Sequence, residues 1–567
     1  MTKQCVQCSK TFQIEPRDLE FYKKIQVPEP TSCPRCRLIR RLLERNARAL
    51  YKRTCDFSGK EIISQFHAKQ PFPVYDQKIW WSDQWDALKY GRPIDFNRPF
   101  FEQFQELVNV VPHMSVFVIG GTLENSDYTN CTGYLKDCYL VSEADYNENC
   151  YYSNRLFLNN KDLIDCSDCY HNELCYECIN CTDCYQTMYA QEGYNCLNSY
   201  FLYDCRDCKD CIGCINLRHQ QYMIFNTQYT AAEYDKRKQE LHLDTRTGVE
   251  QLRANCQKFF STKIHKYLQS EFNQQSFGDH LYHSTNATYC FDCTELENCK
   301  FCTKILKAKD CMDHTAWGMN AELTYECASC GDNIYDLKFC NTCTTQLSHC
   351  AYCYLCTASS NLFGCVGLKK KQYCILNKPY APEEYKRLRQ RLIEHMQRTG
   401  EYGKFFPLAL CPFAYNETVA MDYFPLTKVE ALQQGYSWYE EERTFSAASF
   451  QLPDSINAVT DDVLQAVLVC NDCDKNYRLI KQELDFYKQL SIPVPNRCYT
   501  CRHLARVQRR NPIELWHRQC MCLPDRQAGT QVDHNHPGRC AEKFETNFSP
   551  ERKEIIYCEE CYKKETY

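Results

Sequence analysis

The middle of the chain is dominated by a three-residue pattern of cysteines and polar residues. Cysteines recur at every third position in runs such as 175–184, and Asp, Asn and Tyr stand between them. The pairs Asp165-Cys166, Asp183-Cys184 and Asp204-Cys205 recur after 18 and 21 residues. A repeat of this length suits one coil of a β-solenoid with small cysteines stacked in its core. Asn and Asp would supply left-handed corners in a chain with only 18 Gly.

This pattern occurs in two blocks, 124–245 and 275–396, that are copies of each other. A shift of 151 residues maps Gly213-Cys214 onto Gly364-Cys365, and Gln221-Tyr222 onto Gln372-Tyr373. Each block ends in a charged segment whose apolar residues are spaced by three or four, which predicts an amphipathic helix. We therefore expect two cysteine-rich, β-solenoid-like blocks, each closed by a capping helix.

The two ends of the chain are also copies. A shift of 465 residues maps 5–55 onto 470–520 without a gap, and 18 of the 51 positions are identical. The segments 56–123 and 397–460 are rich in aromatics and are interpreted as packed connectors, which leaves 461–520 as a second end module and 521–567 as an addition to it. The overall prediction is a multidomain, mainly β protein, with repeat blocks flanked by the end modules.

Composition narrows the chemistry of the chain. It has 567 residues, 44 of them Cys, with a formal net charge of −5 and a mean hydropathy of −0.59. No apolar run is long enough to span a membrane, and the first residues carry no apolar signal core. We expect a cytoplasmic location, where reduced cysteines serve as metal ligands or small buried thiols rather than as disulfides.

Each end module carries two Cys-x2-Cys pairs separated by 24 residues. Such pairs form tight turns that present two sulfurs to one metal, and this spacing is a strong signal for tetrahedral zinc. The second pair opens a segment with helical spacing, which places its thiolates at a helix N-terminus. A knuckle, a hairpin and a helix arranged in this way form a treble-clef finger. The predicted ligands are Cys5, Cys8, Cys33 and Cys36, and Cys470, Cys473, Cys498 and Cys501.

A third metal site is predicted near the C-terminus, which would bring the total to two or three structural zinc ions. Its expected ligands are Cys522, Cys540, Cys558 and Cys561. Cys520 is left out because the first end module keeps its equivalent, Cys55, without such a tail. His536 or Cys520 remains an alternative for one of the four positions.

The end modules resemble bacterial probable zinc-ribbon domains built on Cys-x2-Cys, an acidic residue before Phe-Tyr, Pro, and Cys-x2-Cys-Arg. The residues that carry this resemblance are Cys5, Cys8, Phe12, 19–22, Pro28, Cys33, Cys36 and Arg37, and Cys470, Cys473, Tyr477, 485–487, Pro493, Cys498, Cys501 and Arg502. The whole order resembles uncharacterised cysteine-rich proteins of candidate-phyla-radiation (Patescibacteria) bacteria, through 363–370, 373–378 and 556–562. That resemblance implies a single-gene architecture and a bacterial cytosol, and no activity.

Charge is distributed unevenly. Residues 1–55 hold 13 Lys/Arg and 5 Asp/Glu, whereas residues 124–220 hold 6 and 16. Arginines follow each second Cys-x2-Cys pair at helical spacing. A zinc-pinned arginine helix can bind phosphate, so these residues are candidates for binding nucleic acid, RNA more than DNA. They are Arg37, Arg40, Arg41, Arg45, Arg48, Arg502, Arg506, Arg509 and Arg510. The other interpretation is a face that balances the protein's own acidic centre.

A rival function is a scaffold that binds protein or holds metal through the acidic, Tyr-rich repeat blocks. For the central cysteines, a structural ladder, further zinc sites and an iron–sulfur cluster stay open; the run Cys-x2-Cys-x2-Cys begins a ferredoxin-type motif but lacks its continuation.

Common catalytic motifs are not found, so an enzyme is the less favoured class. The string 532–538 resembles the opening of an HNH nuclease, with His534 in the catalytic position. The Cys-x2-Cys expected close behind it comes more than 20 residues later. We therefore favour His534 and His536 as loop residues or spare zinc ligands.

Overall fold

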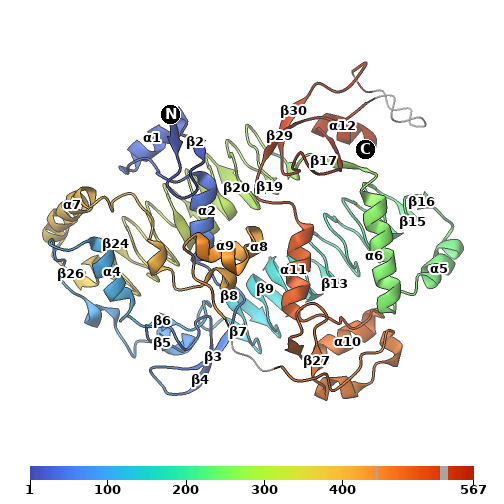
Figure 1. Cartoon of the computed structure of the whole chain (residues 1–567), viewed down its shortest axis with the longest axis horizontal. Coiled ribbons are helices and arrows are strands. Elements are labelled where there is room, and N and C mark those ends of the chain that lie inside the picture. Colours follow the sequence, from blue (N-terminus) through green and yellow to red (C-terminus); the bar gives the residue numbers. More distant parts are fainter. Residues whose placement is uncertain (441–444, 524–533, 535) are drawn as a thin grey trace. The chain divides into compact units, whose positions relative to one another are not determined.

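The computed structural model describes residues 1–440, 445–523, 534 and 536–567, and the chain divides into two units. Unit 1 comprises Met1–Phe117 and Leu268–Tyr439, and unit 2 comprises Val118–Tyr267 and Glu440–Tyr567. Each unit therefore combines one end module with the repeat block that is more distant in the sequence: the first end module with the second block, and the second with the first (Figure 1).

Both blocks are β-solenoids built from a three-residue unit. In the triplet 178–180, Cys178 is buried, Ile179 bridges to Ser167 and Gln191 in the neighbouring coils, and Asn180 has a φ of 52°. The amide of Ile179 donates to the carbonyl of Ala190 (3.0 Å), and that of Asn180 donates to Ser167 (3.0 Å). Each triplet thus hydrogen-bonds to the coils on both sides, which offsets the cost of a left-handed residue at every third position.

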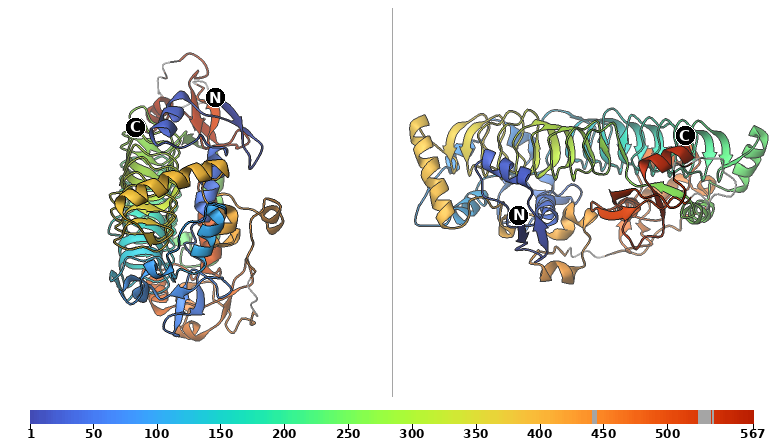
Figure 2. Two further views of the ribbon diagram at one scale, coloured as in Figure 1. Left: turned by 90° about the vertical axis from the view of Figure 1, so that its left-hand side faces the viewer. Right: turned by 90° about the horizontal axis from the view of Figure 1, so that it is seen from above.

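Four triplets make one coil, so bridged residues are mostly 12 positions apart, as in Thr182↔Tyr194 and Tyr194↔Arg206. The stacked coils are visible edge-on in Figure 2. The prediction that one coil spans a repeat of 18 or 21 residues is therefore wrong. The Asp-Cys pairs that suggested it are six and seven triplets apart. They therefore reflect the three-residue unit and not the length of a coil, which is four triplets.

The narrow core explains the cysteines. Many of the buried thiols donate to a carbonyl in the next coil, as Cys166 Sγ does to Cys175 O (3.5 Å) and Cys178 Sγ to Thr187 O (3.2 Å). Where the inward residue is Asn172, its amide makes the same contact, to Cys181 O (2.7 Å). The position thus selects a short side chain that can donate a hydrogen bond, and Cys meets both requirements with little desolvation cost.

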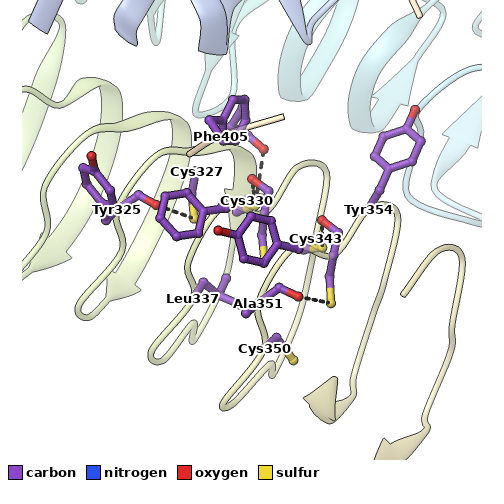
Figure 3. Close-up of a cluster of buried hydrophobic side chains, with 14 of the residues drawn as sticks. Tyr325, Cys327, Cys330, Leu337, Cys343, Cys350, Ala351, Tyr354 and Phe405 are labelled. Atoms are coloured by element: carbon purple, nitrogen blue, oxygen red, sulfur yellow. Dashed lines mark hydrogen bonds between the residues drawn. The ribbon is translucent and has the colours of Figure 1, made fainter. Parts of the chain in front are cut away.

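Part of the solenoid in unit 1 has a wider coil. From His314 the bridged pairs, such as His314↔Cys327 and Gly331↔Thr344, enclose one residue more than four triplets, and the left-handed positions Asp332 and Asp336 are four positions apart instead of three. The thiol acceptor shifts in step, from the ninth following residue to the tenth, as in Cys330 Sγ to Cys340 O (3.7 Å). One side of the coil thus holds an extra residue, and Leu337 and aromatic rings join the cysteines in the core (Figure 3).

Short parallel strands form the solenoid sheets, and the last strands of each solenoid form an antiparallel pair, β15–β16 or β25–β26. In unit 2 they are β7 (Leu123–Glu124), β8 (Asn130–Lys136), β9 (Ser142–Tyr151), β10 (Asn154–Phe157), β11 (Lys161–Ile164), β12 (Ser167–Tyr170), β13 (Glu173–Tyr176), β14 (Lys209–Ile212), β15 (Gln221–Ile224) and β16 (Thr227–Gln228). In unit 1 they are β18 (Ser270–Glu271), β19 (Leu281–Tyr282), β20 (Cys293–Glu297), β21 (Thr303–Lys309), β22 (His314–Ala321), β23 (Cys327–Gly331), β24 (Ser360–Phe363), β25 (Gln372–Ile375) and β26 (Lys378–Pro379).

Helices α5 (Ala231–Glu240) and α7 (Pro382–Arg398) lie after the two blocks, where the sequence predicts capping helices. Tyr234 of α5 is buried against Tyr222, and Tyr385 of α7 against Tyr373, each at a ring distance of 5.7 Å. These two pairs are related by the same shift that relates the two blocks. Helix α6 (Arg246–Phe260) follows α5 in unit 2.

The end modules have matching elements. The first contains β1 (Thr2–Gln4), β2 (Thr11–Gln13), α1 (Pro16–Lys24), α2 (Pro34–Leu43), β3 (Tyr51–Thr54) and β4 (Glu61–Ser64). The second contains β27 (Leu468–Val469), β28 (Asn476–Tyr477), α10 (Lys481–Leu490), α11 (Tyr499–Arg509), β29 (Trp516–Gln519), β30 (Lys543–Thr546), β31 (Ile555–Tyr557) and α12 (Glu559–Thr566).

The predicted connectors fold as short elements around these modules. They include β5 (Val74–Tyr75), α3 (Gln77–Trp81), α4 (Phe100–Val108), β6 (His113–Met114), α8 (Ala420–Tyr423) and α9 (Lys428–Gln433), with short 3-10 turns between them. In unit 2, β17 (Ile264–Lys266) pairs with β31 in parallel. None of the helices in the described part of the chain combines the length and apolarity needed to cross a bilayer.

Candidate metal centre

The first end module brings its four predicted ligands together. Cys5 and Cys8 lie in the turn between β1 and β2, Cys33 is the residue that caps α2, and Cys36 lies in its first turn. The four sulfurs lie within 4.8 Å of one another. The amide of Cys33 donates to Cys5 Sγ (3.2 Å), so backbone donors support the negative charge of the cluster.

The second end module repeats this arrangement. Cys470 and Cys473 lie in the turn between β27 and β28, while Cys498 caps α11 and Cys501 lies in its first turn. Their sulfurs also lie within 4.8 Å of one another. The capping residues Cys33 and Cys498 share the same backbone angles, φ −66° and ψ 160°. The duplication seen in the sequence therefore extends to the ligand geometry.

These distances fit zinc. Cys8 Sγ and Cys33 Sγ are 3.8 Å apart, and Cys473 Sγ and Cys498 Sγ are 3.7 Å apart. A tetrahedral ion with Zn–S bonds of about 2.3 Å places its sulfurs about 3.8 Å apart. Four buried or half-buried cysteines at this separation can hold one zinc ion in each end module.

A third cluster lies at the C-terminus, with one ligand different from the expected set. The structure brings together Cys520, Cys540, Cys558 and Cys561, whereas Cys522 lies in a neighbouring group. Cys558 caps α12, and its amide donates to Cys520 Sγ (3.3 Å), as the amide of Cys33 does to Cys5. Cys520 is therefore the residue that belongs with Cys540 and Cys558, which is the alternative that the sequence had left open.

The neighbouring group comprises Cys522, His534, His536 and Cys561. Cys522 Sγ lies 3.5 Å from His534 Nδ1, and Cys561 Sγ lies 3.5 Å from His536 Nε2. Residues 532, 533 and 535 of the nuclease-like string lie outside the described residues. The two described histidines point to cysteines, in agreement with the interpretation as zinc ligands.

The surroundings of Cys55 explain why comparison of the two end modules led us to leave Cys520 out of the third metal site. Both cysteines receive a hydrogen bond from the residue that caps a short helix: Asp76, before α3, donates its amide to Cys55 Sγ (3.3 Å). In unit 1 the capping residue is Asp76 instead of Cys558, so Cys55 keeps the turn without the metal-binding partners. Cys55 and Cys520 thus occupy equivalent positions in the fold, although, among the described residues, only Cys520 lies in a group suited to a metal.

The arginines of α2 are buried against the solenoid of unit 1. Arg37 Nη2 lies 2.8 Å and Arg41 Nη1 3.0 Å from the two carboxylate oxygens of Asp313, all three side chains being at most 1% exposed. Arg41 also donates to Thr315 Oγ1 (2.9 Å). One aspartate between β21 and β22 thus accepts two guanidinium groups from the zinc-bearing helix.

Unit 2 has the corresponding cluster. Arg502 Nε lies 3.2 Å and Arg506 Nη1 2.6 Å from Asp165, which is fully buried. Arg502 has a second carboxylate, Glu483 of α10, at 3.0 Å. Asp313, Asp165 and Glu483 were not identified from the sequence. The sequence does repeat a pair of arginines at equivalent positions of the two end modules. If such a pair is buried, it requires an acidic partner, and this could have prompted a search for one.

The other predicted arginines also contact the chain. Arg40 donates to Phe406 O (3.2 Å), Arg45 to Ser329 Oγ (2.7 Å) and Arg509 to Glu177 O (3.1 Å), while Arg48 pairs with Asp422 (2.8 Å) and Arg510 with Asp168 (3.1 Å). The charge pattern at the ends is thus used within each unit, as in the second of the two interpretations above.

The central cysteines behave as a ladder. Burial raises the pKa of Cys166 and of Cys175 well above the usual thiol value, and each Sγ donates to a carbonyl. Within the described ranges, the four groups suited to a metal lie outside the solenoids. The geometry favours protonated, packed thiols over zinc or iron–sulfur ligands in the core.

Fold and sites together define a cysteine-rich, mainly β protein with β-solenoids and four clusters suited to metal ions, with zinc as the fitting metal. No family model matches the chain, and no curated protein matches it. Among solved structures, a protein of Desulfovibrio desulfuricans G20 described as a "putative acetyltransferase" shares 10% identity with a TM-score of 0.11. That match covers 40% of this chain and 63% of the other, less than two thirds of its length.

Proposed function

We propose that this protein is a zinc-dependent scaffold, in which metal binding in each end module fastens that module to a solenoid. One observation carries the proposal and occurs in both units. The helix that carries two candidate metal ligands at its N-terminus, one as the capping residue and one in the first turn, also holds two arginines that pair with a single buried aspartate of the solenoid.

Metal binding and the buried ion pairs are linked through the position of the helix that carries both the cysteines and the arginines. A buried ion pair is stable only when its geometry is held closely, because the charges have lost their water. Zinc would fix the first turn of α2 through Cys33 and Cys36, and Arg37 and Arg41 follow within the next two turns. Metal binding and docking on the solenoid should therefore stabilise each other.

Binding of RNA through these arginines is not part of the proposal. Their guanidinium groups already donate to carboxylates and carbonyls of the same unit, and a phosphate would have to displace Asp313 or Asp165.

A protein partner is the second candidate function, and exposed tyrosines on the acidic solenoid of unit 2 support it. Tyr134 and Tyr146 stack with ring centres 4.4 Å apart while 45% and 49% exposed, and Tyr185 and Tyr194 are similarly exposed. Such amphipathic rings are enriched in protein interfaces. A partner with a basic surface would complement the excess of acidic residues.

The test of the scaffold proposal is a ligand substitution in one unit. Cys36→Ser should lower bound zinc by one ion per chain and remove hydrogen-exchange protection from α2 and β22, while α11 keeps its protection. Cys411→Ser is the matched control, because Cys411 is half-buried near α2 and donates to Leu43 O (3.3 Å) while lying outside the metal groups of the described residues. Loss of the zinc with unchanged protection of α2 would contradict a structural role for the metal.

An RNA-retention assay belongs beside it. The double variant Arg41→Glu/Arg506→Glu should unfold or loosen both units, and the wild-type protein should show no salt-sensitive RNA retention. Retention by wild type that Arg41→Glu/Arg506→Glu abolishes while both units stay protected would restore the nucleic-acid interpretation.

A further inference from the structure

The two metal-binding groups at the C-terminus share one ligand. Cys561 belongs both to the cluster with Cys520, Cys540 and Cys558 and to the group with Cys522, His534 and His536. In each group the ligand atoms lie within 4.8 Å of one another. Seven side chains thus surround two adjacent positions, and the Cys561 sulfur lies between them.

The second group has distances that a metal requires. For tetrahedral zinc with bonds of about 2.3 Å to sulfur and about 2.0 Å to nitrogen, a sulfur and a nitrogen ligand lie about 3.5 Å apart. The separations from Cys522 Sγ to His534 Nδ1 and from Cys561 Sγ to His536 Nε2 are both 3.5 Å. The two histidines contact different cysteines, and the four ligand atoms lie within 4.8 Å of one another, so both pairs surround the same position.

His534 is also oriented as a metal ligand. Its Nε2 lies 2.6 Å from Glu565 Oε1, and the imidazole is 2% exposed at the side-chain level. When Nε2–H donates a hydrogen bond to this carboxylate, the proton of the neutral imidazole is on Nε2, and the unprotonated Nδ1 faces Cys522. Glu565 lies on α12, the same helix that carries Cys561, so one helix sets both the shared thiolate and the histidine orientation.

Charge favours a second ion. A single divalent ion in the Cys520 cluster leaves four thiolates with a formal charge of −2 beside the buried Cys522 and two imidazoles. Two divalent ions and five thiolates have a formal charge of −1, and a thiolate shared by two cations is better neutralised than one bound to a single cation. The amide of Cys558 and the N-terminus of α12 also face the cluster.

We propose that the C-terminal module holds a binuclear zinc centre in which the Cys561 thiolate bridges two ions. One ion is bound by Cys520, Cys540, Cys558 and Cys561, and the other by Cys561, Cys522, His534 and His536. The inference rests on metal binding as in the proposed function, but it concerns only the fourth ion and the bridge.

The first test is stoichiometry by native mass spectrometry of protein prepared with zinc. The wild type should carry four ions, His534→Ala should carry three, and Cys561→Ser should lose both ions of the module. His517→Ala is the matched control, because His517 is an exposed histidine of β29 in the same module, and it should retain four ions. Three ions in the wild type, with no change in His534→Ala, would overturn the proposal while leaving the scaffold proposal intact.

The second test addresses the bridge in the unaltered chain. After replacement of zinc by cadmium-113, the two ions of the centre should show scalar coupling through the shared sulfur, and the two end-module ions should show none. Four cadmium signals without any coupling would overturn the bridge even if four ions bind.

Discussion

The two units use the same helix to reach a solenoid, but they satisfy its charges differently. In unit 1 Asp313 is the carboxylate that accepts both Arg37 and Arg41, while Asp18 pairs with Lys300 (2.8 Å). In unit 2 the residue equivalent to Asp18 is Glu483, which binds Arg502 and accepts a hydrogen bond from the Tyr152 hydroxyl (2.8 Å).

This comparison shows which part of the contact between the end module and the solenoid is the same in both units. Both units keep two arginines on one buried aspartate, whereas the neighbouring pair changes from a lysine with an acid to a tyrosine with an acid. A lysine contributes a charge and requires a carboxylate of its own, which leaves Asp18 unavailable to Arg37. A tyrosine contributes no charge, so Glu483 is free to serve Arg502. Two local solutions thus support the same docking geometry.

The largest difference between the units should appear at their equivalent cysteines, Cys520 and Cys55. Cys520→Ser should remove zinc from the C-terminal module and abolish protection of β31 and α12, because structural zinc contributes on the order of 10 kcal/mol to small metal-bound modules. Cys55→Ser should leave the zinc content unchanged and cost about 1 kcal/mol, the value of one lost hydrogen bond. Metal analysis and hydrogen exchange of both variants measure this; equal zinc loss would show that Cys55 is a ligand as well.

The next effect concerns the shared aspartates. Asp313→Ala leaves two buried arginines without their carboxylate and should cost about 4 kcal/mol in unit 1. Asp165→Ala should cost less in unit 2, because Arg502 keeps Glu483. Exchange protection of α2 and α11 reports each unit separately.

The control for this pair is Asp183→Ala, an exposed partner of His171. Asp183 has the same left-handed backbone (φ 54°) as Asp313 (φ 53°) and Asp165 (φ 55°), so Asp183→Ala should cost only about 1 kcal/mol, the backbone contribution that all three variants share. A loss in Asp165→Ala as large as that in Asp313→Ala would show that Glu483 does not compensate.

The smallest effect is a pH dependence confined to unit 1. Burial raises the pKa of Glu44 to about 7, with Arg40 acting against the shift, and Asn341 donates to the carboxylate (2.9 Å). Because the folded pKa lies above the unfolded one, the contribution of the protonated group is present at low pH and is lost as pH rises from about 4.5 to about 7. In unit 2 the equivalent position is Arg509.

Glu44→Gln should therefore raise the unfolding free energy by up to about 2 kcal/mol at about pH 8, with a gain that shrinks toward about pH 5. Hydrogen exchange of α2, measured as a function of urea concentration with zinc in excess, tests this pH dependence. Glu61→Gln on exposed β4 should show no such trend. A gain that does not vary with pH would point to packing instead of ionisation.

Much of the metal chemistry could be predicted from the sequence, because zinc ligands depend on local spacing. The pairs at Cys5 and Cys33, and at Cys470 and Cys498, define their sites within one short end module. The choice between Cys520 and Cys522 could not be made in this way, because it depends on which cysteine faces the capping amide of Cys558. Local spacing does not contain that information.

The fold was predicted as a β-solenoid, but its coil length and partners were not. The triplet is visible in the sequence, whereas the number of triplets per coil is set by hydrogen bonding between coils. The pairing of each end module with the more distant block depends on Asp165 and Asp313. These two residues do not follow the shift that relates the blocks, because the wider coils of unit 1 insert extra residues between Asp313 and the aligned positions that come after it.

The exchanged pairing has a consequence for synthesis on the ribosome. The first end module is translated long before the solenoid on which its arginines are buried, so Arg37 and Arg41 stay in water until Asp313 emerges. The second end module meets a solenoid that is already complete, and it can dock as soon as it binds metal. Unit 2 can therefore form in the order of translation, whereas unit 1 can close only after its second segment has been made, and its formation is the slower step.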